Sequence, residues 1–335
     1  MLSIKHIYRH FILFVIVTSS NSLSTSPAHA ENDEDFRQEP VFPIPQKIEV
    51  NENKVKLGEI LFFDSRLSKN NTLSCASCHQ LDSGGDDNVA IGISISGGLH
   101  IINTPSIFNA VYNFRQNWNG SAKSLHEQIE LLMISQHEFD HTWDAVVAKL
   151  ASDTNLKHEF TLNYADGITK NNIIDALVEF EKTLITPNSR FDRFLRNESN
   201  ALTKEELAGY KLFKELGCIS CHQGINIGGN LYQKFGVFYN YLAEQGNINK
   251  TNHGRMNITG RLIDDQVFKV PSLRNIAVTA PYFHDGSAKT IVQAIDIMGR
   301  TQLGRDLKID EIILIKAFLQ TLTGEYKNKP LVPNQ

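Results

Sequence analysis

The chain has 335 residues, of which 41% are hydrophobic, and its 33 Lys and Arg against 37 Asp and Glu give a formal net charge of −4. This mild acidity argues against a nucleic-acid-binding protein, which would carry an excess of basic side chains. The length exceeds what a single hydrophobic core usually serves, so two domains of about 150 residues are expected.

The segment 1–30 has the features of a secretory signal peptide. Lys5 and Arg9 precede a short apolar run at 11–17, and a small-residue cleavage pattern ends at Ala30. The run is far shorter than the roughly 20 residues that a membrane span needs, and no later stretch approaches that length. Cleavage after Ala30 removes two cations and no acid, which takes the formal charge to −6. We therefore expect an exported protein without a membrane span.

The rest of the chain has a mainly helical pattern. Residues 31–50 contain three closely spaced prolines and are expected to form an extended lead-in rather than a packed element. Apolar residues recur at three- or four-residue steps over 121–135 and over 171–185, which predicts two amphipathic helices. A last helix is predicted over 310–322, with Gly324 as its C-cap. Few strand signals and long glycine-rich loops complete a mainly α fold.

A domain boundary is expected near residue 190, where a polar stretch begins. Beyond that stretch a new helix should begin at Thr203, which has the spacing of a capping box with Glu206. The chain is thereby divided into an N-terminal domain of residues 51–190 and a C-terminal domain of residues 191–335.

The two predicted domains share an internal repeat. A G-x-x-L-F sequence that begins at Gly58 leads to Cys75, and the same sequence from Gly209 leads to Cys218 over a shorter connection. Each half therefore has a helix end that leads into a cysteine motif, which suggests two copies of one small domain type.

All four cysteines lie in two C-x-x-C-H units, residues 75–79 and 218–222. Structural zinc is one interpretation, but the units lie far apart in the chain and a four-cysteine site would leave both histidines without a role. A thioredoxin-like redox disulfide is a second interpretation, but the chain lacks the βαβ pattern that should surround it. Covalent attachment of c-type haem is the third, and it is favoured because this spacing lets two thiols reach two vinyl groups of one porphyrin while the next residue offers its imidazole to the iron. The expected attachment residues are Cys75, Cys78, Cys218 and Cys221, with His79 and His222 as proximal ligands.

The opposite axial position decides what each haem can do. A second strong ligand is typical of an electron carrier, whereas a vacant or labile position permits chemistry. Beyond the signal segment the chain offers Met133, Met256 and Met298 as thioether ligands. Most methionines fill hydrophobic cores, so the residues alone leave the choice open.

The segments VPSLRNIAVTAPYFHDGSAKTIVQAIDIMGRTQLG (270–304) and NTPSIFNAVYNFRQNWNG (103–120), with the two C-x-x-C-H units, resemble the bacterial di-haem cytochrome c peroxidases, a family that includes MauG-like enzymes. The resemblance runs from about residue 54 to residue 323. It implies two cytochrome c-like haem domains with long loops, packed around an inter-domain interface. The N-terminal domain would hold the peroxidatic haem and the C-terminal domain the electron-transfer haem.

The resemblance also assigns individual residues. Met298 matches the distal ligand of the C-terminal haem, opposite His222, at a position where MauG itself has a tyrosine; this favours ordinary peroxidase chemistry. Trp118 matches a tryptophan between the haems that can relay electrons. Glu138 matches the active-site glutamate, with Gln128 as its glutamine neighbour.

A calcium site is implied by the same resemblance. Asn103, Thr279 and Pro281 match the ligands of a calcium ion between the domains, through one side-chain oxygen and two backbone carbonyls, which are the hard oxygen donors that calcium prefers. His284 matches a motif residue near the haem interface, but no chemical role is assigned to it.

One position departs from the family pattern. In many members a histidine eight residues before the motif asparagine caps the resting peroxidatic iron. Here that position is Ile95, which cannot bind iron. Either the N-terminal haem is open at rest, as in MauG-like members, or His100 reaches it from another point of the loop. The open form is favoured because a lone loop histidine is usually solvated.

The implied reaction is reduction of hydrogen peroxide to water, with electrons from a small periplasmic cytochrome c or cupredoxin, by a periplasmic homodimer. One alternative is a MauG-like oxidase that modifies Trp or Tyr of a partner protein, which an open haem favours and Met298 disfavours. A second alternative is a non-enzymatic di-haem electron carrier, which would have two six-coordinate haems and no peroxide turnover.

Overall fold

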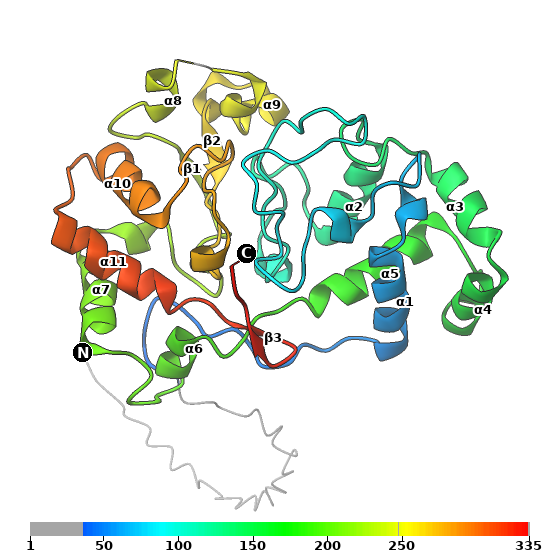
Figure 1. Cartoon of the computed structure of the whole chain (residues 1–335), viewed down its shortest axis with the longest axis horizontal. Helices are drawn as coiled ribbons and strands as arrows, with labels where there is room; N and C mark the ends of the chain where they lie inside the picture. The colour runs from blue at the N-terminus through cyan, green and yellow to red at the C-terminus, as the bar shows by residue number, and fades with distance from the viewer. Residues whose placement is uncertain (1–35, 247, 334–335) are drawn as a thin grey trace, which may run out of the picture. The chain divides into compact units, whose positions relative to one another are not determined.

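The computed structural model describes residues 36–246 and 248–333, so the predicted signal peptide lies outside the described residues. Helices dominate, as predicted, and Figure 1 shows their arrangement. Within the described ranges no helix is long and apolar enough to span a membrane. The α-helices are α1 (Glu52–Phe62), α2 (Leu125–Ile134), α3 (Trp143–Ala151), α4 (Thr154–Asn163), α5 (Lys170–Lys182), α6 (Arg190–Leu195), α7 (Lys204–Glu215), α8 (Tyr241–Glu244), α9 (Met256–Thr259), α10 (Ile291–Gln302) and α11 (Ile309–Gln320).

Two short antiparallel sheets accompany the helices. β1 (Tyr232–Lys234) pairs with β2 (Val267–Lys269), and β3 (Glu325–Tyr326) pairs with β4 (Lys329–Pro330). In the first sheet Tyr232 lies opposite Lys269. These strands are too short to form a core of their own, which leaves the packing to helices and loops.

The N-terminal half, residues 51–190, is built on the pair α1 and α5. A Cβ atom at Gly58 of α1 would lie 2.0 Å from the carbonyl oxygen of Ala176 on α5, so only glycine permits this close crossing. The buried side chains around it include Leu57, Leu61, Phe62, Phe160, Ile173, Ile174, Leu177 and Phe180.

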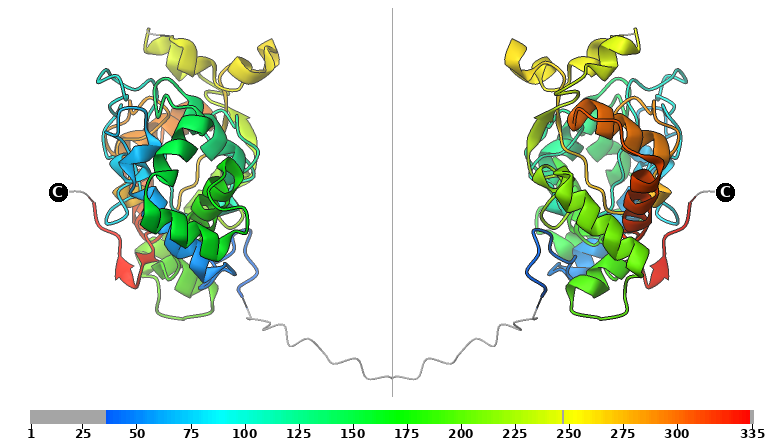
Figure 2. Two further views of the ribbon diagram at one scale, coloured as in Figure 1. Left: turned by 90° about the vertical axis from the view of Figure 1, so that its right-hand side faces the viewer. Right: turned by 90° about the vertical axis from the view of Figure 1, so that its left-hand side faces the viewer.

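The C-terminal half, residues 191–333, repeats this arrangement with α7 and α11. A Cβ atom at Gly209 would lie 2.0 Å from the carbonyl oxygen of Leu314. The predicted repeat of the two G-x-x-L-F segments is therefore confirmed as a repeated helix crossing. In Figure 2 the pair α1 and α5 faces the viewer on the left, and the pair α7 and α11 faces the viewer on the right. The core of this half includes Phe191, Leu195, Tyr210, Phe213, Ile312, Ile315, Phe318 and Leu322.

The ends of the described chain cross over between the halves. The described part of the lead-in, residues 36–50, has no helix or strand, as expected, but it is packed: Val41 is 1% exposed within the core of the C-terminal half, and Ile44 is fully buried. The prediction of an unpacked lead-in was wrong, because Val41 packs into the hydrophobic core of the C-terminal half. At the other end Tyr326 and Leu331 pack on the core of the N-terminal half. The domain limits at residue 190 stay a prediction.

Helix limits differ from the predicted ones at two places. The helix expected over 121–135 begins at Leu125, because Ser124 caps it by accepting from the backbone N–H of Glu127. The last helix ends at Gln320, so Gly324 is not its C-cap. Gly324 is instead needed for a close approach, since a Cβ there would lie 2.0 Å from the carbonyl oxygen of Thr186.

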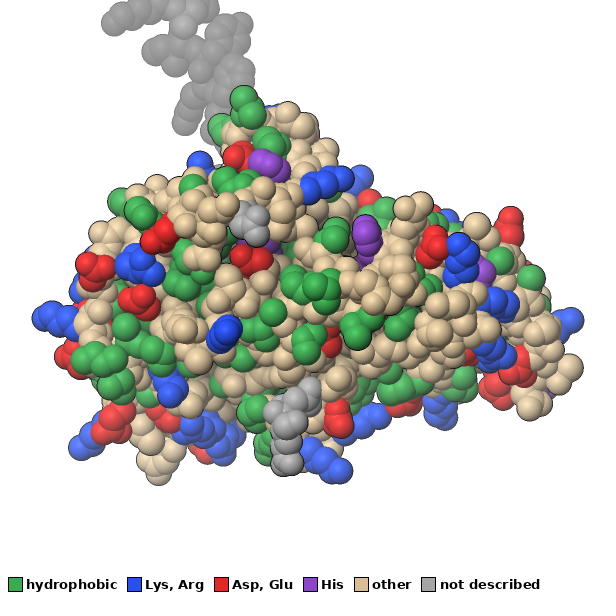
Figure 3. All heavy atoms as spheres, turned by 45° about the horizontal axis from the view of Figure 1, so that its top comes forward, with side chains coloured by type: hydrophobic (Ala, Val, Ile, Leu, Met, Phe, Trp, Pro, Cys, Tyr) green, Lys and Arg blue, Asp and Glu red, His purple; other side chains and the backbone are tan. Residues whose placement is uncertain are grey.

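The other two helix predictions hold. Thr203 caps α7 and forms the predicted capping box with Glu206. The helix predicted over 171–185 is confirmed as α5, at Lys170–Lys182, although its C-cap at Thr183 ends it three residues before the predicted limit. On the face drawn in Figure 3, positive and negative side chains are mixed along the rim, with hydrophobic side chains between them.

Candidate functional site

The two C-x-x-C-H units fold in the same way. Each begins with one 3-10 turn, Cys75–Ser77 in the first and Cys218–Ser220 in the second. In both turns the histidine backbone N–H donates to the carbonyl of the first cysteine at 3.0 Å. All four cysteines are free of disulfide bonds. We call residues 75–79 the first haem turn and residues 218–222 the second haem turn; each presents two thiols and one imidazole from a single turn.

Both histidines are oriented by a backbone carbonyl. His79 Nδ1 donates to Gly85 O at 2.9 Å, and His222 Nδ1 donates to Ile227 O at 3.1 Å. Because a carbonyl can only accept, the proton sits on Nδ1 and Nε2 keeps a free lone pair, as in a metal-binding histidine. Burial lowers the pKa of His79 and lowers that of His222 to about 4, so both imidazoles are neutral. Neutral imidazoles of this tautomer fit haem iron.

The two carbonyls are held by matching segments, PSIFN at 105–109 and PSLRN at 271–275. The N–H of Ile107 donates to Gly85 O at 2.9 Å, and that of Leu273 donates to Ile227 O at 3.3 Å. The serine of each segment donates its hydroxyl to the carbonyl of the residue just before Gly85 or Ile227: Ser106 to Gly84 O at 2.6 Å, and Ser272 to Asn226 O at 2.9 Å. The repeat therefore extends to the support of each proximal histidine.

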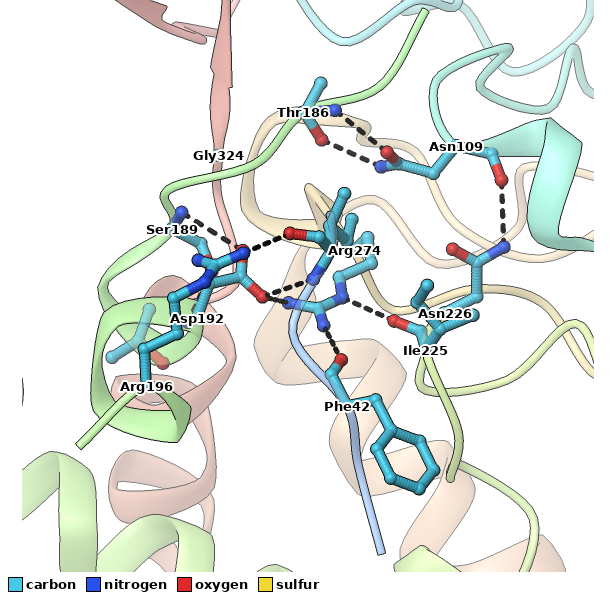
Figure 4. Close-up of polar contacts among 12 residues, drawn as sticks. Phe42, Asn109, Thr186, Ser189, Asp192, Arg196, Ile225, Asn226, Arg274 and Gly324 are labelled. Carbon is cyan, nitrogen blue, oxygen red and sulfur yellow. Dashed lines mark hydrogen bonds and ion pairs between the residues drawn. The ribbon is translucent and has the colours of Figure 1, made fainter. Parts of the chain in front are cut away.

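One position of these segments differs in chemistry. Phe108 of the first segment packs against Tyr326, with ring centroids 5.1 Å apart. Its counterpart Arg274 is buried and pairs with buried Asp192 at 2.8 Å. Arg274 also donates to the carbonyls of Ile225 and Phe42, at 2.9 and 2.8 Å (Figure 4). This cation fixes the loop of the second haem turn, and breaking such a buried pair costs about 3–5 kcal/mol.

The second haem turn borders a cavity of about 540 Å³, within the roughly 300–1,000 Å³ of cofactor sites. Both of its thiols, its imidazole and Met298 of α10 line this cavity. His222 Nε2 makes no hydrogen bond with a described residue. Two thiols, a free imidazole nitrogen and a thioether around an apolar cavity fit a covalently bound haem with histidine and methionine ligands. The apolar lining includes Phe213, Phe235, Phe268, Ile295, Ile315 and Leu319.

Helix α2 is the counterpart of α10 in the N-terminal half. Isolated bridges pair Gln116 with Ala122 before α2, and Tyr282 with Ala288 before α10. N-caps follow at Ser124 and Thr290. Eight residues after its N-cap, α10 carries Met298, whereas α2 carries Leu132 at the same place. The N-terminal half therefore lacks a thioether ligand at this position.

Glu138 lies near the first haem turn, in the loop after α2. Burial raises the pKa of the Cys78 thiol to about 11, and the nearby carboxylates of Asp87 and then Glu138 add to this shift. Burial also raises the pKa of Glu138 itself, an effect that the nearby His100 and His137 oppose. A carboxyl group whose pKa is raised in this way is suited to accept and return a proton.

His100, rather than Ile95, is the loop residue that approaches Glu138. The distance from His100 Nε2 to Glu138 Oε1 is 3.8 Å, and His100 Nδ1 lies 3.2 Å from Ile102 O. The His100 side chain is thus held beside the carboxylate. Gln128 is half-buried on α2, and its counterpart Ala294 on α10 lines the cavity of the second haem turn. This correspondence places Gln128 on the inward side of α2.

Trp118 joins the two halves. Its indole Nε1 donates to Asn103 O at 2.9 Å, and its own carbonyl accepts from Lys269 N at 2.9 Å. Its ring lies edge-on to His284, with centroids 6.3 Å apart. Trp118, His284 and Asn103 all line the cavity of the second haem turn. Trp118 is therefore fixed between that cavity and the N-terminal half.

The three predicted calcium ligands lie on the same cavity. Asn103 is 6% exposed, and its Nδ2 donates to the carbonyls of Val89 and Ala90 at 2.9 and 3.2 Å. This leaves Asn103 Oδ1 free to bind a cation, and the residues Thr279 and Pro281 line the cavity with it. One carboxamide oxygen and backbone carbonyls are donors that fit calcium.

A structural zinc site finds no support in the described part of the chain. The four cysteines lie in two separate turns, and no group of three or more His, Cys, Asp or Glu side chains there is arranged to hold a metal ion. Each imidazole instead lies in the same turn as two thiols, as the haem interpretation requires.

Three buried charged features of the site escaped the sequence analysis. Asp86 is 3% exposed on the same cavity, and burial raises its pKa to about 7. Lys269 is 7% exposed on that cavity, and the pair of Asp192 and Arg274 lies behind the second haem turn. An alignment of the NTPSIFN and KVPSLRN segments would have drawn attention to Lys269 and Arg274, because the charge changes within an otherwise similar pattern.

Comparisons with known proteins identify the family of this chain. The family model described as "Di-haem cytochrome c peroxidase" matches residues 52–200. The cytochrome c551 peroxidase of Nitrosomonas europaea is 41% identical over 321 residues, which cover 95% of each chain. A cytochrome c peroxidase of Escherichia coli is 43% identical over 301 residues, 89% of this chain and 64% of that protein, so the chain spans less than two thirds of that relative. The crystal structure of a MauG-like protein associated with microbial copper homeostasis matches with a TM-score of 0.75 and 28% identity, over 86% of this chain and 94% of the other.

Proposed function

The chain belongs to the di-haem cytochrome c peroxidase family, a family of haem-dependent oxidoreductases, and on this premise we propose that it reduces hydrogen peroxide to water at the first haem turn. The reaction consumes two electrons and two protons for each peroxide and yields two waters. Electrons would come from a small periplasmic cytochrome c or cupredoxin and enter at the second haem turn. The observation that carries the proposal is the asymmetry of two otherwise matching sites: Met298 lines the cavity of one, whereas Leu132 and a nearby Glu138 mark the other.

The first haem turn would hold one haem through Cys75, Cys78 and His79, and the second would hold another through Cys218, Cys221, His222 and Met298. Bound in this way, the two haems supply iron redox chemistry, for peroxide reduction at the first site and for electron transfer at the second.

Glu138 is the proposed proton carrier. Its carboxylate takes a proton from one oxygen of peroxide and delivers it to the other, so that this second oxygen leaves as water. Such a positioned acid–base group contributes typically 10²–10⁴ in rate. His100, 3.8 Å away, holds the carboxylate in place, and Gln128 would complete the polar side of the site.

Trp118 is the proposed link between the sites. Its indole is tied by Nε1 to Asn103 O, and its carbonyl is tied to Lys269 N. These two bonds keep the ring in one orientation at the junction of the halves. A calcium ion bound by Asn103, Thr279 and Pro281 would stiffen this junction, so chelation should lower activity.

The remaining parts of the proposal concern the molecule as a whole. We propose domains at 51–190 and 191–335, export to the periplasm after removal of residues 1–30, and a homodimer. The described residues supply the two separate hydrophobic cores that such a division requires.

The decisive experiment is an absorption and spin-resonance spectrum of the resting protein, followed by addition of peroxide to a mixture with reduced cytochrome c. The expected result is two covalently bound haems per chain, one of them high-spin, and rapid oxidation of the cytochrome. Two low-spin haems that are inert to peroxide would mark an electron carrier and overturn the proposal. A low-spin first haem that becomes high-spin in His100→Gln would show that His100 ligates the iron and that the resting site is not open.

A MauG-like oxidase is the second candidate. The similarity to a MauG-like structure and the absence of a ligand at Ile95 and Leu132 favour it, whereas Met298 opposes it. A partner protein that acquires a modified Trp or Tyr during peroxide turnover would favour this candidate over the peroxidase.

A further inference from the structure

Lys269 is a buried cation that has no partner among the described residues. It is 7% exposed, ends β2 and lines the cavity of the second haem turn. Its side-chain ammonium forms no hydrogen bond or ion pair with any residue in 36–246 or 248–333. Burial alone lowers the pKa of Lys269 to about 8, and no neighbouring carboxylate opposes the shift. The fold therefore keeps a positive charge at a place where nothing in the described chain compensates for it.

The other charges that line the cavity are accounted for. Arg274 pairs with Asp192 at 2.8 Å, and Asp86 accepts from Asn88 Nδ2 at 3.1 Å. Neither carboxylate lies within ion-pair distance of Lys269. Because a buried ammonium is costly unless an anion pairs with it, the cavity is built for a ligand that brings a negative group to Lys269.

The backbone holds Lys269 firmly at this place. Its N–H donates to Trp118 O at 2.9 Å, and it lies opposite Tyr232 in the β1–β2 sheet drawn in Figure 1. The next residue, Val270, donates to Leu231 O at 3.0 Å and accepts from Gly229 N at 2.8 Å. The lysine stem therefore starts from a fixed point beside the tryptophan link.

The apolar lining of the cavity and the cation that no described residue pairs with indicate which kind of anionic ligand fits it. Its walls are largely aromatic and aliphatic, and Lys269 is the one unpaired cation among the described residues that line it. A free phosphate would need several donors at once. A haem is a flat apolar ring that carries two propionate carboxylates. Its ring can pack against the apolar walls while a propionate pairs with the ammonium group of Lys269.

We propose that Lys269 pairs with a propionate of the haem held by the second haem turn and thereby raises the reduction potential of that haem. The inference rests on the proposed function, in which this haem receives the electrons. A fixed positive charge stabilises the state with one more electron, and local charge is one of the levers that set haem potentials. Lys269 thus acts in the same direction as the Met298 ligand.

The counterpart of Lys269 in the N-terminal half supports this assignment. Asn103 occupies the same place before its P-S segment, and its N–H donates to His284 O at 2.8 Å, just as the N–H of Lys269 donates to Trp118 O. Asn103 is neutral, so the built-in charge belongs to the second haem turn alone. A difference in potential between the two haems is therefore built into equivalent positions of the repeat.

The test is a redox titration of the full-length holoprotein, followed by optical absorption, for Lys269→Met and Lys269→Arg. We expect the potential of the methionine-ligated haem to fall in Lys269→Met and to stay near the parent value in Lys269→Arg, with the other haem unmoved in both. Lys234→Met is the matched control, because Lys234 is an exposed lysine on the paired strand and the change in net charge is the same. A vibrational spectrum should also show a shifted propionate bending mode in Lys269→Met alone.

A parent-like potential in Lys269→Met with full haem content would overturn the inference, and so would an equal fall in Lys234→Met. If Lys269→Met does not fold, Lys269→Gln gives the same neutralisation with a polar side chain and the same expected fall. Peroxide turnover is measured on the same preparations. An inactive parent with two normal haem potentials would count against the proposed function, whereas the shift between variants tests Lys269 by itself.

Discussion

The two halves of the molecule support their haem turns through the same contacts but differ in what they set around the iron positions. Each proximal histidine donates to a carbonyl that a P-S segment holds. Around these shared contacts the equivalent positions of the two halves differ. Leu132 corresponds to Met298, Phe108 to Arg274, and Asn103 to Lys269. The contacts that fix a haem have been kept in both copies, and the positions that set its reactivity have diverged.

A fourth pair extends the comparison to the helix crossings. Phe180 and Phe318 pack on Gly58 and Gly209, and the residues that follow them are Glu181 and Leu319. Leu319 lines the cavity of the second haem turn, whereas Glu181 is 6% exposed and adds to the effect of burial in raising the pKa of the Cys75 thiol. The N-terminal half thus places a carboxyl group where the C-terminal half has an aliphatic wall. Burial raises the pKa of Glu181 to about 8, so below that pH this carboxyl group is neutral and the charge of Lys269, unpaired among the described residues, remains the difference between the two sites.

The largest effect is expected at Glu138, which has no acidic counterpart in the C-terminal half. Glu138→Gln removes the proton carrier and should lower peroxide turnover by about 10²–10⁴ while both haems stay attached. Stopped-flow oxidation of reduced cytochrome c measures the rate. Glu159→Gln, at an exposed position of α4, serves as the control and should retain full turnover. A Glu138→Gln protein as fast as the parent would remove this residue from the mechanism.

The pair of Glu181 and Leu319 predicts different pH dependences of stability for the two halves. Burial raises the pKa of Glu181 to about 8, so the folded protein binds its proton more tightly than the unfolded chain does. The protonated Glu181 therefore adds to the free energy of unfolding. Its contribution is fully present below about pH 4 and is lost as the pH rises through 8, and its size is about 1.4 kcal/mol for each unit by which the folded and unfolded pKa values differ.

Glu181→Gln should therefore gain stability over the parent as the pH rises from 5 to 9, by up to about 4 kcal/mol. Urea unfolding of the holoprotein at several pH values measures the difference. Glu215→Gln, at an exposed position, should show no such trend. A constant difference between Glu181→Gln and the parent at all pH values would show that Glu181 is not protonated in the fold.

The helix crossings should respond alike, because they are the shared part of the repeat. Gly58→Ala and Gly209→Ala each place a methyl group 2.0 Å from a carbonyl oxygen of the facing helix. Each should destabilise the protein by about 1–3 kcal/mol through overpacking, despite the better helix propensity of alanine. Thermal unfolding checks this, with Gly98→Ala as the control, since its nearest neighbour would lie 3.8 Å away. Unequal losses at the two crossings would break the equivalence.

The smallest expected effect comes from copying the methionine into the N-terminal half. Leu132→Met offers a thioether at the place equivalent to Met298, and a preference of only about 1.4 kcal/mol for the bound form would close the site in ten of eleven molecules. The resting high-spin signal should fade, and turnover should drop roughly tenfold. Leu131→Met, at the exposed neighbouring position, is the control. An unchanged spectrum in Leu132→Met would mean that the two helices differ in register.

Local signals in the sequence were enough to predict much of this molecule. The 3.6-residue periodicity predicted α5 and α11, the Thr203 capping box predicted the start of α7, and the spacing of two C-x-x-C-H units predicted two similar turns. The cavity that brings Met298 to the second of them depends on contacts between segments far apart in the chain, so only the family resemblance could suggest it. The burial of Val41 and Ile44 was missed for the same reason, because proline spacing describes the backbone and not the core that receives it. Lys269 was missed because an isolated lysine gives no local sign of burial, and only a comparison of the two P-S segments draws attention to it.

The crossing ends of the chain have a consequence for the order of folding. Phe42 accepts from Arg274 across 232 residues, and Lys327 pairs with Glu59 at 3.0 Å across 268 residues. A chain that emerges from its N-terminus first must hold the lead-in unpaired until most of the C-terminal half has followed, and closing such long loops is slow. During that interval both hydrophobic cores are incomplete, because Leu331 belongs to the core of the N-terminal half and Val41 to that of the C-terminal half. In the proposed holoprotein, haem attachment to the two C-x-x-C-H turns would fall within this interval.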